Sequence, residues 1–137
     1  MKIIIIFVLT VVASFCTAQQ PLNIIPQPVS IQQQSGDFVL TVNTAIKYNS
    51  QQKDLKNAVN FFNQQIRNIT GFVLPVNTSQ PTAIQLSIEK LATIGDEGYK
   101  LDITTKGIAI KANTTAGIIY GIQSLLQTLP AIRTNAT

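Results

Sequence analysis

The sequence predicts an α+β fold with two layers: a mostly antiparallel or mixed β-sheet with two α-helices packed on one face. Residues 98–112 alternate apolar and polar side chains on both sides of a short turn, which is typical of a β-hairpin. Apolar residues recur with helical spacing over residues 55–69 and again over 118–129. The order is therefore strands, helix, strands, helix, which favours helices that cover one side of a sheet.

The first 18 residues are expected to be a secretory signal peptide. Lys2 supplies a positive charge, residues 3–12 are almost entirely apolar, and mostly small residues follow up to Ala18. The apolar run is shorter than the roughly 20 residues that a membrane-spanning helix needs. Cleavage after Ala18 leaves 119 of 137 residues: one domain over residues 19–130 and a tail, or the start of a linker, over 131–137. We therefore expect an exported protein, periplasmic or extracellular (lysosomal or secretory in a eukaryote), with no membrane attachment after cleavage.

Composition argues against several kinds of chemistry. The chain has no histidine or tryptophan, and its one cysteine, Cys16, leaves with the signal peptide. Histidine and cysteine are the usual general bases, nucleophiles and zinc ligands, so no cofactor or metal is expected. The net charge is +4, but the lysines are spread along the chain rather than clustered with aromatic residues. Nucleic acid is therefore not expected as a partner.

The N-terminal part of the domain is expected to be extended structure. Prolines disfavour helix over residues 21–28. Residues 29–32 and 38–42 alternate apolar and polar side chains as half-buried strands do, with turn residues over 35–37 between them. A short third strand is expected over residues 45–48.

The first helix is expected to begin after Ser50 as its N-cap and to end at Gly71, where glycine suits a left-handed terminal residue. Its apolar face is formed by residues that repeat with a period of about 3.6: Leu55, Ala58, Val59, Phe62, Ile66 and Ile69. A strand over residues 84–88 and a loop over 89–96 follow. The sequence thus predicts a helix between two strands.

The hairpin is expected to bury Tyr99, Leu101 and Ile103 on one side of the sheet. On the other side, Lys111 is expected to face Lys100 or, favourably, Asp102. Thr105, Lys106 and Gly107 form the turn, where glycine permits a positive φ.

The final helix is expected to be capped at Asn113, Thr114 or Thr115 and to end at Pro130. Gly117 and Gly121 lie four residues apart and share one side of it. Each glycine costs a helix about 1 kcal/mol relative to alanine, so we expect the bare backbone to lie close to the sheet or to another helix.

No reactive group of residues is predicted, and no catalytic, cofactor-binding or metal residue is assigned. Glycoside hydrolysis usually needs two carboxyl groups, and the adjacent Asp96 and Glu97 are the obvious pair to consider. Their position before a strand is more typical of a polar loop, which is the interpretation we favour. Tyr120 is interpreted as a half-buried packing residue. Sequons at Asn68, Asn77, Asn113 and Asn135 would accept glycans only in a eukaryotic secretory pathway.

Three short motifs occur in a defined order between Asn23 and Pro130. They are Ile25-Pro26-Gln27-Pro28-Val29 with Gly36-x-Phe38, then Gly98-Tyr99-x-Leu101 through Gly107-Ile108-x-Ile110, then Thr115-Ala116-Gly117 with Tyr120-Gly121-Ile122-Gln123-Ser124-Leu125-Leu126-Gln127. Together they resemble the N-terminal domain of β-N-acetylhexosaminidases of glycoside hydrolase family 20.

In that family the domain precedes a (β/α)8 barrel that removes terminal N-acetylglucosamine or N-acetylgalactosamine from glycans and chitin fragments. The barrel uses an adjacent Asp-Glu pair together with the substrate's own acetamido group, and such sites lie at the carboxyl ends of barrel strands. Nothing in this sequence corresponds to those strands, and Asp96-Glu97 is not equated with that pair. The resemblance therefore implies a non-catalytic domain, inactive alone, whose expected partner is a barrel in cis and whose parent enzyme acts on glycans.

Two other interpretations remain open. The chain could be the N-terminal domain of another exo-glycosidase, such as an α-glucuronidase or an O-linked N-acetylglucosamine hydrolase, since similar α+β modules precede those barrels. It could also be a stand-alone secreted carbohydrate-binding or adhesion module. That second alternative needs exposed aromatic residues on a flat face, whereas aromatics make up 7% of the chain and most fall on predicted core positions.

Overall fold

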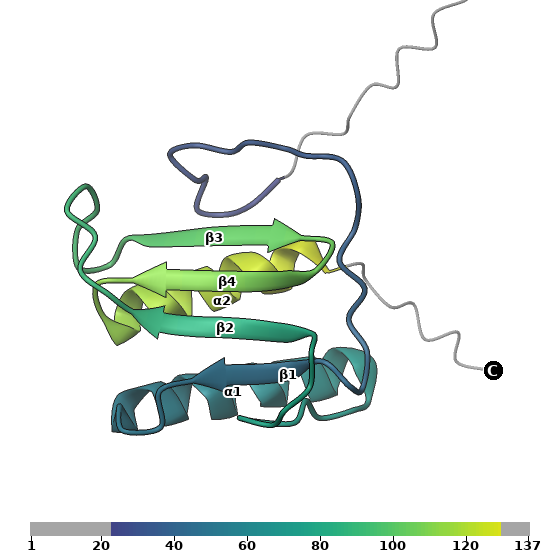
Figure 1. Cartoon of the computed structure of the whole chain (residues 1–137). Helices are drawn as coiled ribbons and strands as arrows, with labels where there is room; N and C mark the ends of the chain where they lie inside the picture. Colours follow the sequence, from purple (N-terminus) through teal and green to yellow (C-terminus); the bar gives the residue numbers. More distant parts are fainter. Residues whose placement is uncertain (1–22, 130–137) are drawn as a thin grey trace, which may run out of the picture.

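The computed structural model describes residues 23–129, which form one sheet with two helices behind it (Figure 1). The two-layer α+β fold is therefore confirmed. In chain order the elements are β1 (Ala45–Tyr48), α1 (Lys53–Thr70), β2 (Ala83–Ile88), β3 (Tyr99–Thr104), β4 (Gly107–Ala112) and α2 (Thr115–Thr128). The expected signal peptide, Cys16 and the tail over 131–137 lie outside the described residues.

The sheet is mixed, with the strand order β1-β2-β4-β3. β1 pairs with β2 and β2 with β4 in parallel, while β3 and β4 form the antiparallel hairpin. The sheet is thus mixed as predicted, with its antiparallel part confined to the hairpin. The reason is that α1 carries the chain back along the sheet between β1 and β2, which makes those two strands parallel.

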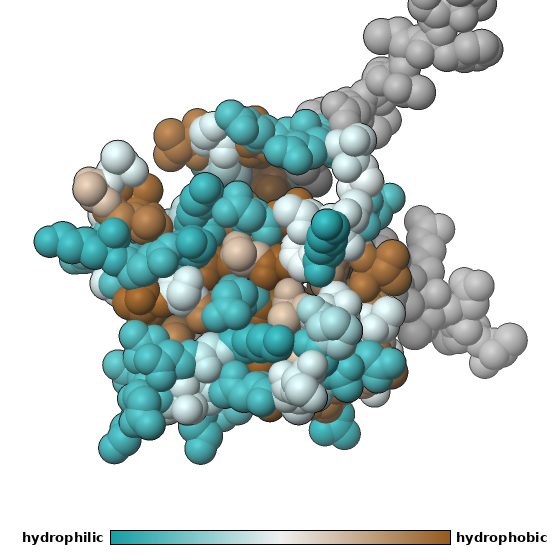
Figure 2. Space-filling view, in the orientation of Figure 1, coloured by the Kyte–Doolittle hydropathy of each residue, from teal (hydrophilic) through white to brown (hydrophobic). Residues whose placement is uncertain are grey.

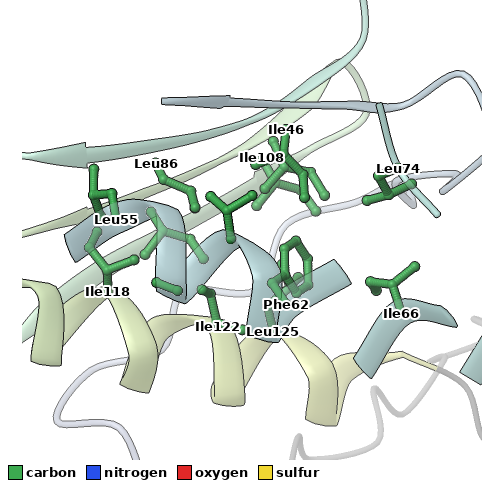
Figure 3. Packing of buried hydrophobic residues seen from close by; sticks show 14 of the residues in the cluster. Ile46, Leu55, Phe62, Ile66, Leu74, Leu86, Ile108, Ile118, Ile122 and Leu125 are labelled. Carbon is green, nitrogen blue, oxygen red and sulfur yellow. The ribbon is translucent and has the colours of Figure 1, made fainter. Parts of the chain in front are cut away.

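The core lies between the two layers, and Figure 3 shows side chains from the sheet and from the helices pointing toward one another. The predicted face of α1 is confirmed except at its end: Leu55, Ala58, Val59, Phe62 and Ile66 are buried, whereas Ile69, in the last turn, is only half-buried. Opposite them, Ile84, Leu86, Ile108 and Ile110 fill the inner side of the two central strands. Alternation along each strand therefore separates an apolar inner face from a polar outer face.

The ends of α1 differ in how well the sequence predicts them. Gly71 terminates the helix with a φ of 81°, as expected for a left-handed C-terminal residue. The prediction of Ser50 as N-cap is wrong, because the helix is preceded by Gln52, whose side chain makes no capping bond. Asn49 instead folds the preceding residues into a turn, since its Oδ1 accepts from the Gln51 N–H at 3.0 Å. This turn delays the helix until Lys53.

The strands predicted over residues 29–32 and 38–42 are absent: the structure, described from residue 23 onward, has no strand before β1. The side chains still alternate, because Phe38 and Leu40 pack against the core while Val39 is exposed. The backbone of these residues, however, pairs with no strand of the described chain. The outer edge of β1 is occupied by a different segment, through a parallel bridge between Ile46 and Val76.

The hairpin forms as predicted, with three differences. Tyr99 and Leu101 are half-buried against the core, but Ile103, which was expected to be buried, is 40% exposed near the end of the edge strand β3. Gly107 does not adopt a positive φ; it is needed because a Cβ there would lie 2.9 Å from the carbonyl oxygen of Ala83. Lys111 pairs with Glu89 at 2.9 Å rather than with Asp102, because its direct neighbour on β3 is Lys100. The hydrogen bond to Glu89 raises the pKa of Lys111 above its usual value.

The predicted packing of α2 is confirmed. Thr114 is its N-cap, and the Thr114 hydroxyl accepts from the Gly117 N–H. Gly117 lies against Gly98 and Ala112, and Gly121 lies against Ile110 and the ring of Tyr99. The two glycines thus let the helix backbone rest directly on β3 and β4.

Candidate functional site

The acidic residues come from separate parts of the fold. Asp54 lies in the first turn of α1, Glu89 follows β2, and Asp102 is on β3 beside Lys100. The pair Asp96-Glu97 is exposed in the loop before β3, where the sequence placed it. Within residues 23–129, no three His, Cys, Asp or Glu side chains form a group that could hold a metal. No helix of this part is long and apolar enough to cross a membrane.

A hollow of about 520 Å³ opens beside the loop that follows β2, lined by Ile88, Glu89, Lys90, Leu91, Ala92, Ile94, Asp96 and Asn113. The amide of Asn113 is fully used in holding this loop. Its Oδ1 accepts from the Leu91 N–H at 2.6 Å, and its Nδ2 donates to the carbonyls of Leu91 and Ile94 at 3.1 and 2.6 Å. Glu89, one of the two carboxylates that line the hollow, is paired with Lys111.

The structural role of Asn113 is one that the sequence did not reveal. Sequence reasoning identified it as a sequon and as one of three cap residues, whereas its side chain binds a loop about twenty residues earlier. A pairing over that separation leaves no local pattern in the sequence. The Asn113 amide nitrogen is engaged with two carbonyls, so a glycan there would displace the loop from it.

The outer side of the sheet, seen in Figure 2, is largely polar. Lys100 and Asp102 form an ion pair on β3 at 3.6 Å, and Lys111 and Glu89 form another. Between these charges lie small residues of the central strands such as Ser87 and Ala109. No aromatic side chain of the four strands points to this face, since Tyr99 and Tyr48 pack against the core.

The outer face of α2 carries no charged side chain. We define it as Ile119, Tyr120, Gln123 and Leu126, which lie away from the glycine side of the helix. α2 carries no charged residue over its 14 residues, whereas α1 carries Lys53, Asp54, Lys56 and Arg67. Ile119 and Leu126 are only half-buried, and Tyr120 is 39% exposed. These side chains therefore leave an uncharged and partly apolar stretch of α2 in contact with solvent.

Comparison with known families fits this arrangement. Residues 21–136 match the family model described as glycosyl hydrolase family 20, domain 2. The chain belongs to glycoside hydrolase family 20. The match covers the two-layer fold described above, and it confirms the family suggested by the three motifs.

The relatives of this family 20 chain are much longer proteins. A β-hexosaminidase of Porphyromonas gingivalis is 26% identical over 113 residues, which is 80% of this chain and 14% of that protein. A lacto-N-biosidase of Bifidobacterium bifidum is 38% identical over 52 residues, which is 38% of this chain and 5% of that protein. The chain therefore spans less than a fifth of the length of these relatives.

Solved structures show the same family 20 fold. The family 20 β-N-acetylhexosaminidase of Streptomyces coelicolor is 31% identical with a TM-score of 0.72, over 81% of this chain and 22% of that one. The N-acetyl-β-hexosaminidase of Streptomyces plicatus, solved with thio-NAglucal, is 29% identical with a TM-score of 0.67, over 78% of this chain and 21% of that one. Asp96 and Glu97 thus lie inside a domain that is about a fifth of such an enzyme.

Proposed function

We propose that this chain is the non-catalytic N-terminal domain of an exported β-N-acetylhexosaminidase-like enzyme, and that it has no hydrolase activity alone. The catalytic barrel is its partner, and the outer face of α2 is the surface that contacts it. The predicted signal peptide supports export. In this proposal the parent enzyme removes terminal N-acetylhexosamine from glycans or chitin oligosaccharides.

The uncharged, half-exposed outer face of α2 carries this proposal. Ile119 and Leu126 pack partly against the core yet keep part of their apolar surface exposed, and the helix has no charge that would favour solvent. Family 20 relatives combine this domain with a catalytic barrel. Covering an apolar face of this kind with a second domain stabilises the assembly by about 25 cal/mol for each Å² of apolar surface removed from water.

The names of the relatives support the proposal that this domain does not determine substrate specificity. The matching segment occurs both in a protein named β-hexosaminidase and in one named lacto-N-biosidase. Two different activities beside one type of domain are expected if specificity resides in the barrel loops.

The carbohydrate-binding alternative is not favoured by the surface. Among the aromatic residues that the structure describes, Tyr120 is the most exposed, and it lies on a helix rather than on the flat outer side of the sheet. A glycan titration of the chain, followed by isothermal calorimetry, separates a binding module from a scaffold. We expect no heat of binding with N-acetylglucosamine oligomers.

Catalysis is tested with the chain itself. We expect no release of the chromophore from an aryl N-acetylglucosaminide above the buffer rate, with the Streptomyces coelicolor enzyme as positive control. Hydrolysis above background that survives rigorous purification would refute the non-catalytic assignment.

Contact with the barrel is tested in a chimera in which residues 23–129 replace the matching domain of the Streptomyces coelicolor enzyme. Ile119→Asp is compared with Gln85→Asp, an exposed position on the outer side of β2. Both variants are also made in the chain alone, so that effects on the domain itself can be subtracted. We expect Ile119→Asp to lower the melting temperature of the chimera more than that of the chain, and Gln85→Asp to affect both alike. Equal losses for Ile119→Asp in chimera and chain would refute the α2 surface.

A further inference from the structure

The segment over residues 23–42 is attached to the rest of the domain in an unusual way. It has no helix or strand over twenty residues, and irregular segments of that length inside a compact domain are usually functional. It carries a single charge, at Asp37. Ile24 is buried, and Phe38 and Leu40 are half-buried against the core, while apolar side chains such as Val29 and Val39 are exposed.

Hydrogen bonds join residues 23–40 to the rest of the described chain at one point only. The side chain of Gln127, in the last turn of α2, accepts from the Ile25 N–H at 2.9 Å and donates to the Ile25 carbonyl at 2.9 Å. Both backbone groups of Ile25 are therefore satisfied by one amide, as they would be by a neighbouring strand. The partners are 102 residues apart in the sequence.

This segment lies beside a strand edge that has no partner. β3 is the last strand on its side of the sheet, and within residues 23–129 its outer backbone groups pair with no other strand. In Figure 1 the segment passes along the side of β3 that faces away from β4. Gly36 touches Thr105 at the end of the hairpin: a Cβ at Gly36 would lie 2.7 Å from the Thr105 methyl group. The segment thus stands over the edge without pairing with it.

We propose that residues 23–42 form a strap that shields the free edge of β3, and that Gln127 is the latch that keeps the strap closed. Exposed strand edges promote association with other chains, and proteins commonly cover them with a loop. The strap opens as a unit because, within residues 23–129, Gln127 supplies the only hydrogen bonds that tie it to the rest of the fold before Thr41. With the strap open, β3 presents an unpaired edge on which a second copy can add a strand.

The latch is tested in the whole chain with Gln127→Ala and with Gln123→Ala as matched control, since Gln123 is an exposed glutamine one turn earlier whose side chain makes no hydrogen bond in the structure. Thermolysin cleaves before residues such as Phe38 and Leu40, and its rate follows the population of the open strap. We expect Gln127→Ala to speed cleavage within residues 23–42 about tenfold, as the loss of two exposed hydrogen bonds implies. Gln123→Ala should cleave at the native rate.

Gln127→Glu keeps the acceptor for the Ile25 N–H but places a carboxylate oxygen against the Ile25 carbonyl, so this variant should also be cleaved faster than the native chain. Amide hydrogen exchange at Ile25 gives the same ranking and also reports whether the helices remain protected. If Gln127→Ala unfolds the whole domain, the ranking is read from Gln127→Glu instead. A strap that opens no faster in either variant would overturn the latch.

The shield is tested by self-association. We expect Gln127→Ala to form β-rich aggregates with a lag time several-fold shorter than that of the native chain. Ile103→Lys, which places a charge on the half-exposed end of β3, should restore the long lag in the double variant because charged residues block edge pairing. If Gln127→Ala opens the strap yet does not associate, or if Ile103→Lys fails to suppress association, the β3 edge is not what the strap protects.

Discussion

Replacing Gly117 with alanine is expected to destabilise the domain, although alanine is the better helix former. A Cβ at this position would lie 2.7 Å from the Cβ of Ala112 and closer still to the carbonyl oxygen of Gly98. Real Cβ atoms do not approach neighbours that closely, so α2 must move away from β4. The carbonyl of Gly98 belongs to the backbone and cannot rotate aside as a flexible side chain would.

Two opposing contributions set the magnitude. Alanine gains about 1 kcal/mol over glycine within a helix. Overpacking a tight interior costs about 1–3 kcal/mol, and we take the upper end because the obstacle is backbone. The free energy of unfolding should therefore fall by about 2 kcal/mol. For a domain of this size that corresponds to a decrease in melting temperature of about 8–16 °C.

Urea unfolding followed by far-UV circular dichroism measures this change, with Gly95→Ala as control. A Cβ at Gly95 meets no atom within 4 Å, so Gly95→Ala should leave the free energy of unfolding unchanged within about 0.5 kcal/mol or raise it slightly. An alanine at 117 that stabilises the chain would show that helix propensity outweighs the close approach. Equal losses at both positions would show that the contact with Gly98 is not the cause.

Three further changes test other contacts. Thr114→Ala removes the N-cap of α2 and should lower the free energy of unfolding by about 1 kcal/mol in the same urea experiment, whereas Thr114→Ser should not. Asn113→Ala removes the hydrogen bonds that hold the loop over 91–95, so amide exchange in that loop should accelerate at least tenfold while the helices stay protected. Glu89→Gln should lower the pKa of Lys111, measured by NMR titration of its side chain, because Glu89 is the main cause of the raised value. The pair's stabilising effect is present below the unfolded-state pKa of Lys111 and is lost as pH rises through the folded value, so native and variant should converge in strongly alkaline solution.

Features that depend on local repetition were predictable from the sequence. The buried face of α1 follows from a spacing of three and four residues, and its end follows from Gly71. The hairpin follows from alternation on both sides of a short turn. The cost of Gly117 and Gly121 within a helix pointed to a close backbone approach, which the structure shows.

Features that depend on a distant partner were not predictable in the same way. Residues 38–42 alternate as a strand does, and Phe38 and Leu40 do pack against the core. A strand, however, also requires hydrogen bonds to the backbone of another strand, and these residues make none within the described chain. Lys111 was expected to face Lys100 or Asp102, because hairpin neighbours are visible in the sequence, and Lys100 is indeed its neighbour on β3. Its actual partner, Glu89, comes from the end of β2, which is adjacent only because β2 and β4 pair in parallel.

Three amide side chains show most clearly what the sequence conceals. Asn63 binds both backbone groups of Leu74, Asn113 binds both of Leu91, and Gln127 binds both of Ile25, over separations of 11, 22 and 102 residues. Each amide offers a donor for the carbonyl and an acceptor for the N–H of the same residue, as a neighbouring strand would, and each fixes an irregular segment to the helix that carries it or follows it. Only 12% of the residues are charged, and these irregular segments are fixed by neutral amide side chains rather than by ion pairs or additional strands. Asparagine and glutamine side chains therefore hold three irregular segments of the fold in place. A substitution at any of these three positions should loosen the segment that it holds before it affects the core.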